Sequence, residues 1–360
     1  MASNTTTHLD YIIVGQGLAG SAVAIQAIKR NKKILVIDNL NENSSSRIAA
    51  GLFNPITGKK MTRTWLADTL FPYLIDFYQF MEDQTQQRFF KPMSLYRPFL
   101  SIEEQNEWMA KSAEPLFLEY IERVTNLPSV PAVVDDFGGL FLKKCGYLDT
   151  SAYIDATRKW IQKTNLFLDD NFDQDQLNIE PQGVDYKGYH AKKIVFCQGC
   201  SATTNKWFDW VPVRPLKGET LKIKTDYKAS QIINRGVYVV PSGETELRVG
   251  ATYNFNDLSP EITDHARMEL EGKLNELVKF DYKIVSQEWG VRPTTPDRRP
   301  IMGAHPEHPA LIIFNGMGTK GVSLTPYFSE VLVRWMEKEI DLNKEVDVNR
   351  YKVLYSKFTK

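Results

Sequence analysis

The stretch Tyr11-Ile-Ile-Val-Gly15-Gln-Gly17-Leu-Ala-Gly20 decides the fold of this chain. Its first four residues form a short apolar run, which is typical of a buried strand. Residues 19–30 then have helical composition and spacing, and residues 33–38 form a second apolar run that ends on Asp38. The order of strand, glycine-rich turn, helix and strand predicts a βαβ unit.

The three glycines stand where a dinucleotide-binding βαβ unit needs them. We expect Gly15 to make the tight turn, Gly17 to let the backbone approach a pyrophosphate, and Gly20 to allow close helix packing. The helix N-terminus would offer free N–H groups to the phosphates. Asp38 follows Gly15 by 23 residues, near the spacing expected of an acid that binds a ribose hydroxyl. Glycine-rich turns also occur in structural loops, but this register favours dinucleotide binding.

Two later segments repeat the pattern of an apolar strand that ends in a glycine turn. They are residues 193–199, which end at Gly199, and residues 310–321, which contain Gly316, Gly318 and Gly321. Residues 322–339 follow as a predicted helix with apolar positions at helical spacing. Because ligands of open α/β sheets gather at the carboxyl ends of strands, we expect these distant segments to build one cofactor domain.

The residues between these segments predict a second domain. Residues 101–104 form a capping box that is expected to open an amphipathic helix through about residue 124. Residues 212–253 alternate like strands, residues 264–278 predict another helix, and residues 288–292 predict a strand that returns to the first domain. Residues 39–46 form a polar loop. The fold class is therefore α/β with two domains.

Composition places the chain among ordinary globular proteins. It has 360 residues, 42% of them apolar, with 44 basic and 44 acidic residues. Zero net charge argues against binding nucleic acid or membrane through overall charge. No apolar run approaches the roughly 18 residues of a membrane span, and residues 1–8 lack signal-peptide features. Three cysteines are too few for a disulfide framework, so we expect a cytoplasmic protein.

These motifs together resemble the FAD-dependent D-amino-acid oxidase superfamily. The resemblance is to its glycine oxidase branch and to the oxidoreductase half of the bifunctional enzyme that completes 5-methylaminomethyl-2-thiouridine in tRNA. It covers nearly the whole chain and rests on the N-terminal fingerprint and on the segments 47–51, 213–218, 238–241, 249–253, 290–297, 300–303 and 316–326, in that order.

The resemblance implies a discontinuous Rossmann-like FAD domain with an inserted antiparallel substrate domain. The expected boundaries are 1–90, 146–217 and 290–360 for the FAD domain, and 91–145 and 218–289 for the substrate domain. The implied chemistry is hydride transfer to flavin N5 from a carbon beside an amine, giving an imine that water hydrolyses. No cysteine stands where a covalent flavin attachment is expected, so FAD should be bound non-covalently.

The resemblance also implies a substrate site. Arg292, in the motif Gly290-Val-Arg-Pro, matches the arginine that binds the substrate carboxylate, and a planar guanidinium suits that task. A structural ion pair at a domain junction is the alternative. Tyr238 and Tyr253 match positions that line the substrate cavity, although strand tyrosines are often packing residues.

The cofactor contacts that the resemblance implies fall in six parts of the chain. Small residues of the segment 47–51 permit close backbone approach to the cofactor, and the segment 316–321 passes the flavin's pyrimidine edge. Lys320 adds a cation there, although loop lysines are usually solvent-exposed. The full set is Gly15, Gly17, Leu18, Ala19, Gly20, Asp38, Arg47, Ala49, Ala50, Gly51, Phe172, Gly199, Gly316, Gly318, Thr319, Lys320 and Gly321.

No metal site is predicted. Cys197 and Cys200 have C-x-x-C spacing, but a second pair of ligands is missing and the five histidines show no ligand spacing. The cysteines instead overlie a strand-to-glycine turn.

The leading functional hypothesis is an FAD-dependent oxidase or dehydrogenase of a glycine-type amine, meaning a small amino acid or an N-substituted glycine. One alternative is a tRNA-modifying enzyme that removes a carboxymethyl group, with Lys59, Lys60 and Arg63 as candidate phosphate contacts. Another is the flavin subunit of an amine dehydrogenase, and a nicotinamide-dependent dehydrogenase competes on the fingerprint alone. The sequence leaves the electron acceptor and the oligomeric state open.

Overall fold

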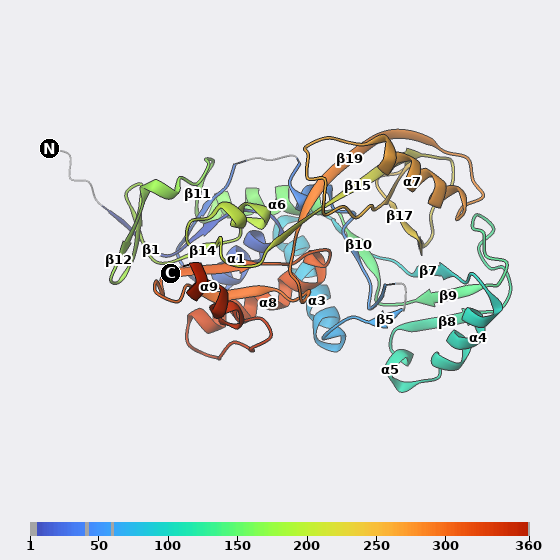
Figure 1. Ribbon diagram of the computed structural model, residues 1–360, viewed down its shortest axis with the longest axis horizontal. Helices are drawn as coiled ribbons and strands as arrows, with labels where there is room; N and C mark the ends of the chain where they lie inside the picture. Colours follow the sequence, from blue (N-terminus) through green and yellow to red (C-terminus); the bar gives the residue numbers. More distant parts are fainter. Residues whose placement is uncertain (1–5, 40–42, 59–60, 359–360) are drawn as a thin grey trace.

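The computed structural model describes residues 6–39, 43–58 and 61–358. Within them the chain forms an α/β half and an antiparallel half, with β12 at one end of the long axis and α4 at the other (Figure 1). Residues 40–42 of the polar loop, and the candidate phosphate contacts Lys59 and Lys60, lie outside the described residues. No helix of the described chain combines the length and the apolar character that crossing a membrane requires.

A sheet with eight strands in the described chain forms the α/β half. Its strands are β1 (Thr7–Val14), β2 (Ile34–Ile37), β11 (Leu166–Leu168), β12 (Leu177–Glu180), β13 (Gly183–Tyr186), β14 (Tyr189–Phe196), β20 (Ile301–Ala304) and β21 (Leu311–Asn315). β1 lies between β2 and β14, and β14 pairs with β21, all in parallel. The three strands predicted to end in glycine turns, β1, β14 and β21, are therefore neighbours, and their carboxyl ends share one edge.

The central strands are apolar throughout because both faces of the sheet are covered. Ile13 belongs to a core with helices α1 (Leu18–Lys29), α3 (Ala67–Thr85), α6 (Thr150–Thr164) and α8 (Gly321–Met336). Its neighbour Ile12 belongs to a second core on the opposite face, together with Trp207 and Phe208. Alternation of side chains along a strand produces these two cores. The predicted helices 19–30 and 322–339 correspond to α1 and α8.

The antiparallel half is built on a second sheet of the described chain in the order β19-β15-β18-β17-β16-β7-β9-β8. It departs from the predicted antiparallel sheet at one place, because β16 and β7 pair in parallel. The strands are β7 (Leu95–Pro98), β8 (Ile121–Thr125), β9 (Gly139–Leu142), β15 (Arg214–Lys224), β16 (Ile232–Arg235), β17 (Val237–Pro241), β18 (Glu246–Gly250) and β19 (Lys283–Thr294). Helix α7 (Asp264–Asn275) packs on β15, β17 and β18. The long strands β15 and β19 run side by side between the two halves (Figure 1).

Smaller elements complete the described chain. They are the strands β3 (Leu52–Phe53), β4 (Ile56–Thr57), β5 (Thr62–Arg63), β6 (Phe90–Pro92) and β10 (Gly146–Leu148), the helices α2 (Ser45–Ile48), α4 (Ile102–Lys111), α5 (Pro115–Leu118) and α9 (Lys352–Phe358), and the 3-10 turns η1 (Gln174–Gln176), η2 (Gly199–Thr204) and η3 (Val348–Tyr351).

The prediction of one helix from the capping box to about residue 124 is wrong. The start is as expected, since Ser101 Oγ accepts a hydrogen bond from the Glu104 amide at 3.3 Å. However, α4 ends at Lys111, and Pro115, which has no N–H to continue a helix, begins the separate helix α5. Residues 121–125 then form β8, which pairs with β9. Tertiary pairing overrides the weak helical pattern of this segment.

Candidate cofactor and substrate site

The first glycine turn leaves no room for side chains. Gly15 has a φ of +92°, and a Cβ on Gly20 would lie 1.7 Å from the Gly15 carbonyl oxygen. A Cβ on Gly17 would lie 2.8 Å from Ser46 Oγ. The Leu18 amide, in the first turn of α1, donates to the same hydroxyl at 3.1 Å. The N-terminus of α1 is therefore bordered by glycine backbone and by the small Ser46 hydroxyl, a setting that fits a pyrophosphate.

Asp38 lies beside this turn. Its carboxylate accepts a hydrogen bond from the Gln16 amide at 2.9 Å and faces the Arg158 guanidinium at 3.4 Å. Burial raises the pKa of Asp38, while the Gln16 amide and the Arg158 charge lower it. Two groups thus hold the carboxylate at the end of β2, where an acid that binds a ribose hydroxyl is expected.

The later glycine turns meet the first one at the carboxyl edge of the sheet. Asn315, at the end of β21, donates from Nδ2 to the Gly199 carbonyl at 2.8 Å. A Cβ on Gly321 would lie 3.0 Å from Leu18 Cδ1, so α8 begins beside the start of α1. Segments some 300 residues apart in the sequence, from Gly15 to Gly318, therefore surround one region.

The segment 47–51 connects the two halves. Ile48 packs on Gly290 of β19, where an added Cβ would lie 3.3 Å from the Ile48 side chain. Arg248 of β18 donates to the carbonyl oxygens of Ile48 and Ala49. A Cβ on Gly51 would lie 1.8 Å from the Leu148 carbonyl oxygen, so Gly51 lets two backbone segments of the protein pack closely, and the approach of this segment to the cofactor stays a prediction. Next to it, the Arg47 guanidinium is ion-paired with Asp155 of α6.

One face of the second sheet brings the predicted substrate residues together. Arg292 and Gly290 of β19 stand opposite Leu216 and Gly218 of β15, and Gly250 of β18 stands opposite Tyr238 of β17. The Arg292 guanidinium lies over Gly218, because a Cβ there would be 2.1 Å from Arg292 Nη1. The three glycines therefore form a floor without side chains beneath the Arg292 and Tyr238 side chains.

Arg292 is held from the neighbouring loop. Its Nη1 donates to the Thr252 carbonyl oxygen at 3.4 Å, and its guanidinium carbon lies 5.1 Å from the centre of the Tyr253 ring. The end of β19 also contacts the cofactor turns, since the Gly318 amide donates to the Pro293 carbonyl at 2.9 Å. Arg292 therefore lies between the antiparallel sheet and the glycine turns.

Arg292 forms no ion pair with any carboxylate of residues 6–39, 43–58 and 61–358, whereas Arg248 on the same face is paired with Glu288 at 3.0 Å. Burial raises the pKa of Tyr238 to about 12, although the charges of Arg292 and Arg248 pull in the opposite direction. The Tyr238 phenol is therefore neutral at pH 7 and can donate a hydrogen bond. An unpaired guanidinium and a neutral phenol on one surface are complementary to a carboxylate.

Two predicted cofactor residues have other contacts. The Phe172 ring stacks on Tyr186 at 4.9 Å and meets Phe196 edge-on at 5.6 Å, so it packs in the second core. Lys320 is half-buried instead of solvent-exposed, and its Nζ donates to the hydroxyls of Thr57 and Thr64. Burial, with the charges of nearby arginines, lowers the pKa of Lys320. A cofactor contact for Phe172 and for Lys320 stays a prediction.

The two cysteines of the C-x-x-C segment are packed inside the protein. Cys197 is buried and burial raises its pKa, while burial raises the pKa of Cys200 to about 12. Cys200 Sγ donates to the Val291 carbonyl at 3.3 Å, so the thiol is held against β19. In the part of the chain that the structure describes, no group of three or more His, Cys, Asp or Glu residues is arranged to hold a metal ion.

Sequence reasoning missed several residues of this site. Ser46 and Arg158 contact the glycine turn and Asp38 from elements far away in the sequence, and no local pattern marks them. Arg248 carried a signal, because it stands two residues before Gly250 in a strand and so shares its face. Gly218 belonged to a recognised motif, but only its pairing with β19 reveals that it makes room for Arg292.

Comparison with known proteins agrees with this geometry. The family described as FAD dependent oxidoreductase matches residues 10–335. The crystal structure of glycine oxidase from Geobacillus kaustophilus is similar, with a TM-score of 0.78 and 20% identity over 93% of this chain and 96% of that one. The bifunctional protein ThiO/ThiG of Nostoc sp. strain PCC 7120 is 23% identical over 88% of this chain and 51% of its own length.

A further relative is the tRNA 5-methylaminomethyl-2-thiouridine biosynthesis bifunctional protein MnmC of Legionella pneumophila, which is 19% identical over 94% of this chain and 57% of its own length. The chain thus spans about half the length of these two curated relatives. The likeness to glycine oxidase supports the two-domain fold, and the family match extends over nearly the whole chain. The chain belongs to the FAD-dependent oxidoreductase family, and its cofactor is FAD.

Proposed function

We propose that this chain oxidises the carbon–nitrogen bond of a glycine-type amine, meaning a small α-amino acid or an N-substituted glycine. The observation that carries the proposal is Arg292, a half-buried guanidinium without a carboxylate partner among the described residues. A buried charge of this kind is costly unless a ligand pairs with it. A substrate carboxylate would supply the missing partner.

Different residues on this face would make different contacts with the substrate. Arg292 offers two parallel N–H groups to a carboxylate, and Tyr238 offers its phenol as a further donor. The glycines at Gly218, Gly250 and Gly290 let the side chains of Arg292, Tyr238 and Ile48 lie close against the sheet. These contacts orient the carbon beside the amine by holding the acid group next to it.

The cofactor residues fit FAD. Gly15, Gly17 and the Leu18 amide would hold the pyrophosphate, Asp38 the ribose, and the segments 47–51 and 316–321 the flavin end. When bound, FAD supplies the hydride acceptor for the oxidation. The protein's share is to bind the substrate, orient it and exclude water from the site.

The test is anaerobic reduction of the bound flavin, followed by its absorbance. Glycine and N-methylglycine should bleach the flavin, whereas methylamine, which lacks the acid, and glycolate, which lacks the amine, should not. Glycolate should instead perturb the flavin spectrum by binding at Arg292. A yellow protein that no amino acid or N-alkyl amino acid bleaches would refute the proposal.

The tRNA alternative uses the same chemistry, because a carboxymethylamine is an N-substituted glycine. Among its candidate phosphate contacts, Arg63 is ion-paired with Asp68 at 2.6 Å. Retention of tRNA at low salt, followed by a change in its modified nucleosides, would support this alternative. Stoichiometric peroxide release by the isolated chain would argue against a subunit that passes electrons to a partner.

A further inference from the structure

Lys217 of β15 is a buried cation outside the face that carries Arg292. Its side chain is 1% exposed, and its Nζ lies 3.1 Å from Asp257 Oδ2, 3.3 Å from Ser259 Oγ and 3.8 Å from Glu219 Oε1. Three acceptors thus surround an ammonium group that has three N–H donors. Burying a charged lysine and its carboxylate partners costs desolvation free energy, so such a cluster is expected where it fixes one conformation of the chain.

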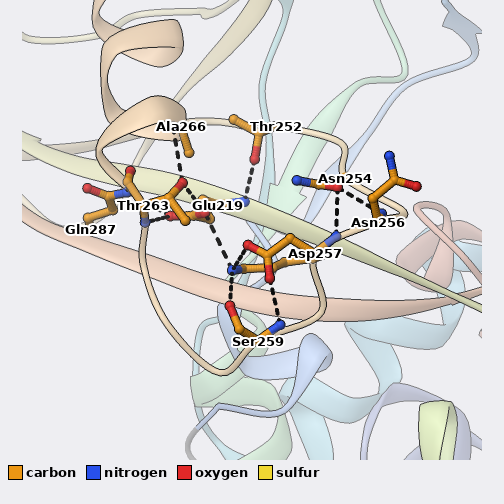
Figure 2. A network of polar contacts seen from close by, with 10 residues as sticks. Glu219, Thr252, Asn254, Asn256, Asp257, Ser259, Thr263, Ala266 and Gln287 are labelled. Atoms are coloured by element: carbon orange, nitrogen blue, oxygen red, sulfur yellow. Dashed lines mark hydrogen bonds and ion pairs between the residues drawn. The ribbon is translucent and has the colours of Figure 1, made fainter.

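Glu219, the next residue on the same side of β15, extends the network to the start of α7. Its carboxylate accepts hydrogen bonds from the Thr263 amide and hydroxyl, both at 2.9 Å, and from Gln287 Nε2 at 2.7 Å. Figure 2 shows Glu219, Thr263 and Gln287 converging, with Asp257 and Ser259 of the loop beside them. Thr263 is the N-cap of α7, so this end of the loop 252–262 is fixed.

The other end of the loop is fixed by the backbone of β15. Lys217 and Asn254 exchange two backbone hydrogen bonds of 2.9 Å each. The Thr252 amide donates to the Glu219 carbonyl at 3.1 Å, and Thr252 Oγ1 accepts from the Glu219 amide at 2.9 Å. We call this set of contacts, made by Lys217 and Glu219 to the loop 252–262 and Thr263, the loop clamp.

The loop clamp acts on the residues that contact Arg292. The Thr252 carbonyl accepts the hydrogen bond from Arg292, and the Tyr253 ring lies against its guanidinium. Side chains alternate along β15, so Gly218 faces Arg292 while Lys217 and Glu219 on either side of it face the loop. The loop is otherwise poorly covered, since Tyr253 is 65% and Phe255 58% exposed.

We propose that Lys217 is a positioning residue for substrate binding: it holds the loop 252–262 so that Thr252 and Tyr253 keep the Arg292 guanidinium directed at a substrate carboxylate. The proposal rests on the proposed function. Lys217 does not touch the reacting atoms, so its loss should weaken carboxylate binding without slowing the chemical step. Displacing a binding group by about 1 Å costs up to ~100-fold in related settings, and we expect about ten-fold here.

The test compares Lys217→Met with Lys273→Met in the flavin-loaded protein. Lys273 is ion-paired with Glu269 on α7 in the same half of the molecule, which makes it a matched control. The first readout is chymotrypsin cleavage at Tyr253 and Phe255, and the second is the Kd of glycolate from the flavin spectrum. Lys217→Met should accelerate loop cleavage, weaken glycolate binding about ten-fold and raise KM with kcat unchanged. Lys273→Met should change none of these.

Asp257→Ala tests the same contact from the exposed loop and does not disturb the sheet. It should reproduce both effects, and the double variant Lys217→Met/Asp257→Ala should be no worse than either single variant. Faster loop cleavage with unchanged glycolate affinity would overturn the positioning role. If the wild-type protein binds no carboxylate, the proposed function fails with it, whereas the cleavage result alone reports whether the clamp exists.

Discussion

Arg292 is a half-buried cation that lies on a sheet surface and forms no ion pair with a carboxylate of the described chain. We predict that Arg292→Ala raises the Kd of glycolate and the KM of the amino acid by two orders of magnitude or more, which corresponds to about 3–5 kcal/mol. Flavin content should not change, because the glycine turns do not depend on this side chain. The Kd and KM of Arg292→Lys should lie between those of the wild type and of Arg292→Ala, since lysine keeps the charge and loses the planar guanidinium. Equal KM values for the three proteins would contradict this role.

Gly218 allows a second test that leaves the charge in place. A Cβ at this position would lie 2.1 Å from Arg292 Nη1, and the guanidinium is the end of a flexible side chain that can move away. Gly218→Ala should therefore fold and retain flavin. It should raise the Kd of glycolate about ten-fold, a smaller change of the same sign as that of Arg292→Ala. The Kd from flavin spectra measures the effect. Unchanged affinity would mean that the guanidinium position is not important for binding.

At the level of elements, a substitution in the turn before α1 should weaken cofactor binding without preventing folding. A Cβ on Gly17 would lie 2.8 Å from Ser46 Oγ, a side chain that can rotate away, but it would narrow the surface that a pyrophosphate needs. We predict that Gly17→Ala purifies folded and with less than about a tenth of the flavin of the wild type. The measurement is the ratio of flavin to protein absorbance, with circular dichroism as the check on folding.

Gly272→Ala is the matched control for that substitution. Gly272 lies in α7, and a Cβ there would meet nothing within 4 Å. The same change from glycine to alanine should leave flavin content intact and stabilise the helix by about 0.5–1 kcal/mol. Flavin loss in both variants would mean that Gly17 has no special relation to the cofactor.

The elements also differ in how far the sequence predicts them. The unit from β1 to β2 follows from local signals, because an apolar run, a glycine turn and a helical period each specify their own structure. The segment 112–125 does not, since Pro115 and the pairing of β8 with β9 decide it and the pairing is non-local. The same holds at the site. Arg292 and Lys217 both stand in segments that the resemblance marks, but the partners of Lys217 come together only when the loop 252–262 folds back on β15.

At the scale of the whole molecule, His305 makes stability depend on pH. It lies in the turn after β20, is 5% exposed, and its Nδ1 accepts hydrogen bonds from the Glu307 and His308 amides, both at 3.2 Å. Its ring meets Phe208 and Tyr355, so it joins the sheet to the C-terminal helix. Burial lowers the pKa of His305 from 6.5 to about 4, with His308 adding to the effect and Glu307 opposing it.

The sign follows from proton linkage. Between pH 6.5 and 4 the unfolded chain binds a proton at this histidine that the folded protein does not, so the free energy of unfolding falls as the pH falls through this range. Urea unfolding at a series of pH values should show this loss, and His305→Gln should flatten it. A His305→Gln slope equal to that of the wild type between pH 6.5 and 4 would assign the pH dependence to other groups.

The gathering of distant glycine turns also predicts what cofactor removal does. Turns at Gly15, Gly199 and Gly318 meet at one edge, and FAD bound there would give their backbone N–H groups a partner that the apoprotein lacks. A ligand that binds only the folded state stabilises it by RT ln(1 + [L]/Kd), about 2.7 kcal/mol at 100 times Kd. The apoprotein should therefore melt several degrees below the holoprotein, added FAD should restore the melting temperature, and ADP should restore part of it. NAD should not match FAD, and Gly17→Ala should show no shift with either. A shift with NAD that equals or exceeds the shift with FAD would overturn the assignment of this edge to a flavin nucleotide.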